Sequence, residues 1–175
     1  DLTAAALIAG LTNCVTLRLD SLATLYSGLG LAKPNHAIGH NESQRTQEEC
    51  RDIIRLHHSK LIANLARKLS EVPEGDGNML DNTMIVYLSD AGEAHHGALH
   101  EWPFLVVGGC GGNLEIPGHY IRMPDYGQAG HRTIGNLYTS ILNAYGDPVE
   151  HFGDPDFELE RGGIPQRGPV DFLIT

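Results

Sequence analysis

Histidines gather at two places in the sequence, with the types and spacing of metal ligands. His36 and His40 are separated by three residues. A second group lies far downstream and joins one carboxylate to three imidazoles: Asp90, His95, His96 and His100. Neutral imidazole binds Zn, Fe or Mn, and the carboxylate also suits a hard cation such as Ca. The layout predicts a divided site for a divalent metal.

The position of Asp90 favours a role in that site. Residues 83–88 form an apolar run typical of a buried strand, which places Ser89 and Asp90 at its carboxyl end. Ligands of open α/β sheets bind at this end of the strands. The alternative is a turn-forming aspartate that caps the backbone after it. Both interpretations of Asp90 remain open.

The first histidine pair is predicted to lie in a loop. Glycines and a proline between residues 25 and 41 break any regular period. The spacing of His36 and His40 therefore does not by itself direct the two rings to one point. His57 and His58 lie near the apolar stripe of a predicted helix. We therefore expect both to pack against other elements with their polar tips exposed to hydrogen-bond partners, and one of them could reach the metal site.

The hydrophobic pattern predicts the elements that must position these residues. Apolar positions three and four apart predict helices, whereas alternating or continuous apolar runs predict strands. The predicted elements are helices at residues 2–9, 44–70 and 133–145 and strands at 15–19, 83–88 and 103–107. Helices that alternate with continuous apolar strands favour an α/β fold with a mainly parallel sheet covered by helices.

Composition limits the classes of partner. The 175 residues suit one compact core, and the formal net charge is −10, from 12 Lys and Arg against 22 Asp and Glu. This charge disfavours nucleic acid and anionic membrane surfaces as partners. The apolar runs are too short to span a bilayer, so we expect no membrane insertion.

The three cysteines do not define a cofactor site. Cys14, Cys50 and Cys110 are far apart, and they form neither a CxxC metal motif nor a CxxCH haem site. A redox or electron-transfer role therefore has little support. One disulfide with a free thiol and three reduced cysteines remain equally open.

The ordered landmarks of the chain resemble the C-terminal half of the HxxSHH family, exported bacterial proteins of unknown function. The landmarks are Asp1-Leu2-Thr3, Val15-Thr16-Leu17, His36 to Asn41, Leu80-Asp81-Asn82-Thr83, Pro103 to Gly109 and His151-Phe152-Gly153-Asp154. The resemblance covers residues 1–156 and leaves 157–175 as an irregular tail that wraps the domain or contacts a partner. It implies a periplasmic or extracellular location. The chain departs from the family motif at Gly39 and Asn41, where the family has Ser and His.

A more distant similarity is to the alkaline phosphatase and sulfatase superfamily, which implies an alkaline-phosphatase-like half domain. The similarity places His36 and His40 at the first metal motif, Asp90 at the strand-terminal aspartate, and His95 or His96 at a later histidine. Ala91 stands where the superfamily has a histidine. The nucleophile of the superfamily would precede Asp1, which suggests a fragment or a processed chain.

These observations predict a metal-binding sulfatase-like or phosphatase-like protein that hydrolyses a small anionic phosphate or sulfate ester when joined to an N-terminal half. The metal would offset charge on the ester, and His96 or His100 would protonate the leaving oxygen. The alternative is a non-catalytic binding or assembly protein of the same fold, whose partner is another protein chain in an oligomer or complex. The altered motifs and the tail rich in proline and glycine favour this alternative.

Overall fold

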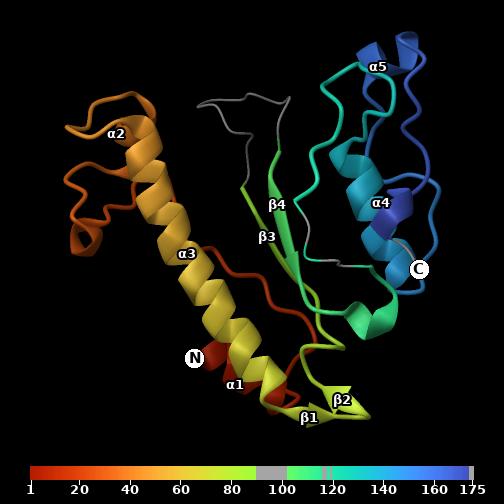
Figure 1. Cartoon of the computed structure of the whole chain (residues 1–175), viewed down its shortest axis with the longest axis horizontal. Helices are drawn as coiled ribbons and strands as arrows, with labels where there is room; N and C mark the ends of the chain where they lie inside the picture. Colours follow the sequence, from red (N-terminus) through yellow and green to blue (C-terminus); the bar gives the residue numbers. More distant parts are fainter. Residues whose placement is uncertain (90–101, 116–117, 119, 174–175) are drawn as a thin grey trace. The chain divides into compact units, whose positions relative to one another are not determined.

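The computed structural model describes residues 1–89, 102–115, 118 and 120–173 (Figure 1). These residues form two compact units, one made of residues 1–72 and the other of residues from 73 onward. Within the described residues, no helix is both long and apolar enough to cross a membrane.

The first unit is built around α3, Gln47–Ser70, which confirms the long helix predicted from the apolar period. Its first turn is closed by a capping box, in which Thr46 and Glu49 satisfy each other's backbone N–H groups. Acidic residues occupy the first turn and basic residues the last, which complements the helix dipole. These local signals explain why the sequence alone located this helix.

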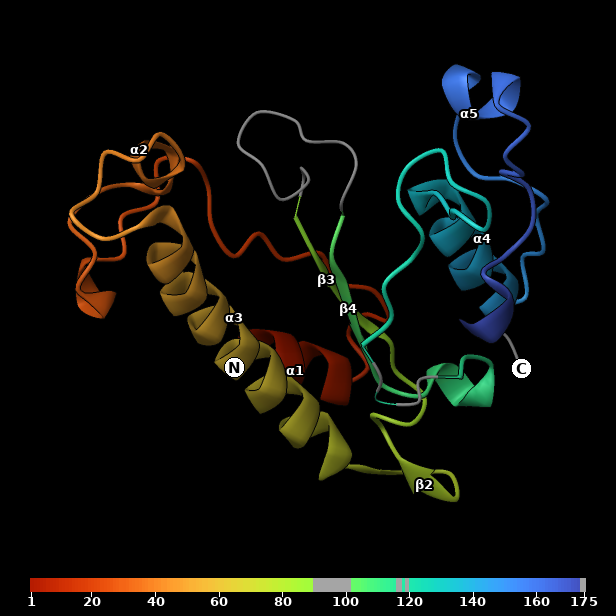
Figure 2. The ribbon, with the colours of Figure 1, turned by 45° about the horizontal axis from the view of Figure 1, so that its top comes forward.

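A short N-terminal helix, α1 (Leu2–Ile8), lies against the C-terminal half of α3 (Figures 1 and 2). Ala4 is buried, and the Asp1 carboxylate forms an ion pair with the ammonium group of Lys68. The predicted helix at residues 2–9 is confirmed. The small alanine side chains allow α1 to approach α3 closely.

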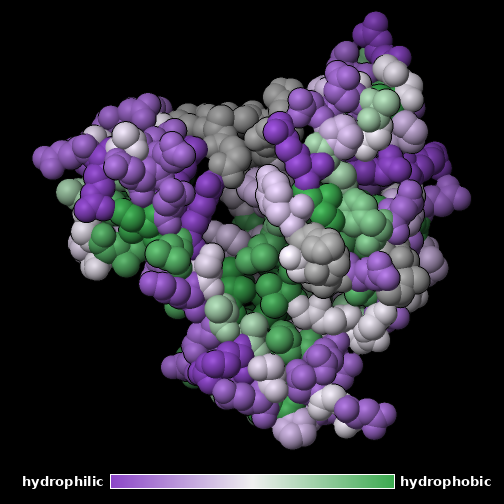
Figure 3. Space-filling view, viewed as in Figure 1, coloured by the Kyte–Doolittle hydropathy of each residue, from purple (hydrophilic) through white to green (hydrophobic). Residues whose placement is uncertain are grey.

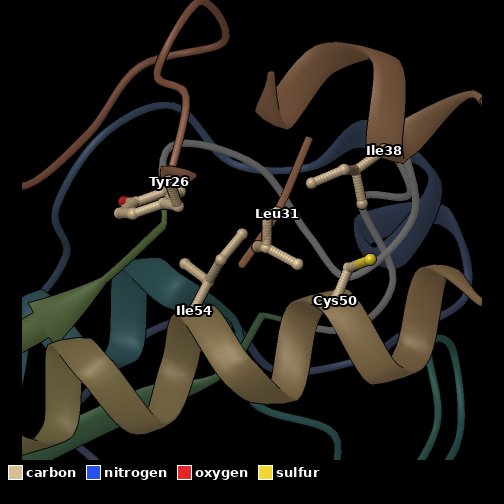
Figure 4. Packing of buried hydrophobic residues seen from close by; sticks show 5 residues of the cluster. All are labelled: Tyr26, Leu31, Ile38, Cys50 and Ile54. Atoms are coloured by element: carbon tan, nitrogen blue, oxygen red, sulfur yellow. The ribbon is translucent and has the colours of Figure 1, made fainter. Parts of the chain in front are cut away.

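The other end of α3 carries the hydrophobic core of the first unit (Figure 4). The short helices η1 (Ser27–Leu29) and α2 (Asn35–Gly39) lie in the connection that precedes α3. Buried side chains from this connection and from α3 meet in one cluster: Tyr26, Leu31, Ile38, Cys50 and Ile54. Burial of Ile38, which is 1% exposed, fixes α2 on α3.

The strand predicted at residues 15–19 is wrong, because this segment is irregular in the structure. Val15, Leu17 and Leu19 are all exposed. Alternating apolar residues form a strand only when a neighbouring strand supplies backbone hydrogen bonds and one face is buried. This segment has neither support among the described residues.

Two antiparallel hairpins form the sheets of the second unit. The first pairs β1 (Pro73–Glu74) with β2 (Gly77–Asn78). The second pairs β3 (Ile85–Leu88) with β4 (Phe104–Val107), with Ile85 opposite Val107 and Leu88 opposite Phe104. The strands predicted at residues 83–88 and 103–107 are therefore confirmed as elements.

The prediction of a mainly parallel sheet covered by helices is wrong, and with it the alkaline-phosphatase-like half domain. The described residues contain five α-helices and only two short antiparallel sheets of two strands each. An apolar run carries no information about strand direction, and the connection between residues 88 and 104 is long enough to permit a crossover as well as a hairpin return. Backbone pairing in the folded chain decides between the two.

The turn after β4 packs unusually closely on the turn before β3. A Cβ atom placed on Gly108 would lie 2.1 Å from the carbonyl oxygen of Thr83, and one on Gly109 would lie 2.5 Å from that of Asp81. The amide N–H groups of Gly109 and Cys110 donate to Leu80 and Thr83 across this contact. The missing side chains of Gly108 and Gly109 therefore permit this close backbone packing.

The last predicted helix is confirmed as α4, Ile134–Ala144. The C-terminal tail continues through α5 (Phe157–Arg161) and η3 (Asp171–Leu173), and it runs alongside α4 in both ribbon views. Polar side chains of α4 hold the tail: the Asn136 amide donates to the carbonyl oxygens of Gln166 and Gly168, and the Val170 N–H donates to the Ser140 hydroxyl.

Candidate functional site

The first histidine pair lies on a helical turn and not in an open loop as predicted. His36 belongs to α2, and His40 is the residue that caps its C-terminal end. One helical turn between them places both side chains on the same face. The two ring centroids are 4.7 Å apart, with the ring planes at 77°. The structure therefore brings these two predicted ligands together.

Backbone contacts on one side and the core on the other hold this turn in place. The N–H groups of Asn35 and His36 donate to the carbonyl oxygens of Thr24 and Leu22, at 2.9 and 2.8 Å. Ile38, between the two histidines, points into the cluster around Leu31 and Cys50 (Figure 4). The histidine pair thus rests on a helix that is anchored at both faces.

The second group of predicted ligands, Asp90, His95, His96 and His100, lies outside the described residues. The described residues on either side of it are linked, since Trp102 Nε1 donates to the carbonyl oxygen of Ser89 at 2.9 Å. Trp102 therefore helps to hold the ends of β3 and β4 together.

A buried polar network lies on the same unit as the histidine pair. The Tyr26 hydroxyl lies 2.9 Å from Asp20 Oδ2 and 2.8 Å from His58 Nε2. Asp20 Oδ2 also accepts a hydrogen bond from Asn35 Nδ2 at 3.3 Å, at the start of α2. Three hydrogen-bonded side chains and the first residue of α2 therefore connect α3 to the turn that carries His36 and His40.

The proton positions in this network follow from the donor inventory. The Tyr26 hydroxyl has one hydrogen, and an ionised Asp20 only accepts, so Tyr26 donates to Asp20. His58 Nε2 must then carry a hydrogen and donate to the Tyr26 oxygen. Burial lowers the pKa of His58, an effect that the Asp20 carboxylate opposes and His57 reinforces. His58 is therefore neutral near pH 7, as the Nε2–H tautomer.

Sequence reasoning did not single out Asp20 or Tyr26. Neither belongs to a motif, and the Tyr26–His58 contact spans 32 residues of sequence. His58 was expected to pack against the helix interface with a polar tip, and the structure shows this arrangement with the side chain 4% exposed. The ring centroids of His57 and Tyr26 lie 6.1 Å apart, in an edge-to-face arrangement.

The remaining described histidines serve the second unit. His131 Nδ1 lies 2.9 Å from the carbonyl oxygen of Pro124, and His151 Nδ1 lies 3.0 Å from that of Gln166. A carbonyl oxygen only accepts, so Nδ1 carries the hydrogen in both rings. These histidines tie loops together.

The described residues supply few ligands for a divalent metal. Among the described residues, no group of three or more His, Cys, Asp or Glu side chains is arranged to hold a metal ion. The pair of His36 and His40 nevertheless supplies two imidazoles on one face of one helical turn, which is a usual arrangement for two ligands of one ion. Two of the six predicted ligands, His36 and His40, are therefore in contact, and the other four lie outside the described residues.

No known protein family matches the chain, and no curated protein and no solved structure is significantly similar to it.

Proposed function

We propose that His36 and His40 are two ligands of a divalent metal in a protein that hydrolyses a phosphate or sulfate ester. The proposal rests on one observation, the 4.7 Å separation of the two imidazole rings on an anchored turn. Paired imidazoles favour Zn, Mn or Fe over Ca, which prefers oxygen ligands. The further ligands in this proposal are Asp90, His95, His96 and His100.

The charge of the chain supports a metal in this role. A formal net charge of −10 opposes the approach of an anionic ester. A bound divalent cation would offset the charge on the non-bridging oxygens of the ester and polarise them.

Metal titration of the purified full chain tests the proposal. After removal of metal with a chelator, calorimetry with Zn²⁺ and Mn²⁺ should show stoichiometric binding that is lost in His36→Asn and in His40→Asn. His57→Asn is the matched control, because it removes an imidazole from α3 of the same unit and should leave the affinity unchanged. Equal binding by all variants would contradict the ligand assignment.

Hydrolysis is tested separately, with p-nitrophenyl phosphate and p-nitrophenyl sulfate as probes. We expect turnover that requires the metal and falls with His36→Asn. Metal binding without turnover of either probe would retain the metal site and reject the hydrolase.

A binding or assembly protein is the second candidate, and the β3–β4 hairpin favours it. Leu88 and Leu105 are 37% and 40% exposed, and Figure 3 shows hydrophobic side chains near the middle of the face that it draws. Isolated two-stranded hairpins are marginally stable, so another chain that covers this surface would stabilise it. Light scattering of the wild type and of Leu105→Glu tests self-association: a dimer that the variant disrupts supports assembly, and a monomer in both contradicts it.

A further inference from the structure

A cavity of about 380 Å³ opens on the surface of the second unit, apart from the histidine pair. Three asparagines from three separate segments line it: Asn82 before β3, Asn113 after η2 (Cys110–Gly112), and Asn143 in the last turn of α4. None of the described residues that line it is charged. The polar groups that the described residues present to a ligand are therefore mainly neutral hydrogen-bond donors and acceptors.

The floor of the cavity is part of the hydrophobic core. Cys110 and Ala144 line the cavity and are both buried in a cluster with Leu114. Met84 and Leu173 pack against the same cluster. The floor is thus preformed, which reduces the ordering cost of binding a ligand.

The asparagine amides retain hydrogen-bonding capacity. Asn82 Nδ2 donates to Glu74, Asn113 Nδ2 donates to the carbonyl oxygen of Cys110, and Asn143 Oδ1 accepts from the Val149 N–H. Each amide has four hydrogen-bonding positions, two donors and two acceptor lone pairs. Within the described part of the chain, the other polar atoms of two of these amides, Asn82 Oδ1 and Asn143 Nδ2, have no hydrogen-bond partner.

Gly111 lies beside the amides of Asn82 and Asn113, and its lack of a side chain leaves the space next to them open. A Cβ atom on Gly111 would lie 3.6 Å from Asn113 Nδ2 and 3.9 Å from Asn82 Oδ1. The cavity wall beside Gly111 therefore carries both a donor and an acceptor, and a hydroxyl group, which both donates and accepts, has the matching chemistry.

We propose that this cavity binds a neutral saccharide. Sugar hydroxyls each donate and accept, which matches the mixed amide lining, and the absence of charge among the described lining residues disfavours an ion. Tyr145 lines the cavity and is 58% exposed, and an aromatic ring is a suitable partner for the apolar C–H face of a sugar ring. The site is independent of the proposed metal ligands.

Saturation-transfer NMR on the full chain tests this site, with the methyl glycosides of glucose, galactose and mannose as probes. We expect binding of at least one glycoside in the millimolar range. Asn113→Ala and Tyr145→Ala should each weaken it by about three- to tenfold, the effect of one lost contact. Tyr120→Ala is the matched control, because Tyr120 is 92% exposed and does not line the cavity.

Two comparison probes define the result that overturns the proposal. Inorganic phosphate tests for an anion site, and N-methylacetamide tests for a site that binds peptide groups. The saccharide site is rejected if no glycoside binds, if either comparison probe binds in place of the glycosides, or if the Asn113 and Tyr145 variants bind like the wild type. Circular dichroism spectra that match the wild type show that both variants fold.

Discussion

The Tyr26 hydroxyl lies 2.8 Å from Nε2 of His58, and both side chains are buried. With Asp20 as the second partner of Tyr26, the hydroxyl donates to one neighbour and accepts from the other. Because Asp20 also holds Asn35 at the start of α2, this contact contributes to the position of His36 and His40.

The lowered pKa of His58 predicts a pH-dependent stability. Burial keeps the pKa below its ordinary value of about 6.5, so the unfolded chain binds this proton first as the pH falls. The contribution to stability is therefore complete above about pH 6.5 and decreases as the pH falls toward and through the folded-state pKa. Urea unfolding followed by circular dichroism, which reports chiefly on the long helix α3, should show this loss.

His58→Gln should flatten that pH dependence, since the glutamine amide donates to Tyr26 but does not titrate. His57→Gln is the control on the same helix turn, and it should retain most of the slope because His57 is the smallest of the named influences on His58. An unchanged slope in His58→Gln would assign the pH dependence to other groups.

Tyr26→Phe tests the network itself. The substitution keeps the ring in the core and removes the oxygen that His58 and Asp20 share. A buried donor left without its acceptor costs about 1–3 kcal/mol, so the free energy of unfolding should fall by that amount. Tyr120→Phe, at an exposed position, should change it by less than about 0.5 kcal/mol. Equal effects of the two substitutions would show that the network does not stabilise the unit.

Gly108→Ala tests the close packing of the turns beside β3 and β4. The new methyl group would lie 2.1 Å from the Thr83 carbonyl oxygen, at a residue with a φ of 104°. Backbone atoms must move, so we expect a loss of about 3 kcal/mol or more in thermal or urea unfolding. Gly127→Ala is matched, since its φ is 76° but no atom lies within 4 Å, and it should cost only about 1–2 kcal/mol. A similar cost at both positions would reject the steric argument.

Asn136→Ala should release the C-terminal tail from α4. The Asn136 side chain is fully buried and donates to two tail carbonyl oxygens, at 3.0 and 2.7 Å. Its loss leaves both carbonyls without this donor, at a cost of about 2–4 kcal/mol, and should expose the segment after α5 to limited proteolysis. Asn64→Ala, at an exposed position of α3, should leave the cleavage pattern unchanged. Unchanged protection in Asn136→Ala would mean that other contacts hold the tail.

Local patterns in the sequence determined α1, α3, α4, β3 and β4, because amphipathic periods, apolar runs and capping residues act within a few neighbours. The same patterns nominated His36 and His40 by type and spacing. Tertiary structure decided what these patterns do not encode. Backbone hydrogen bonds made β3 and β4 antiparallel, and burial of Ile38 turned the expected loop into α2. The hydrogen-bonded network of Asp20, Tyr26 and His58 also depends on tertiary structure. Its Tyr26–His58 contact joins residues that are distant in the chain, which no short-range period specifies.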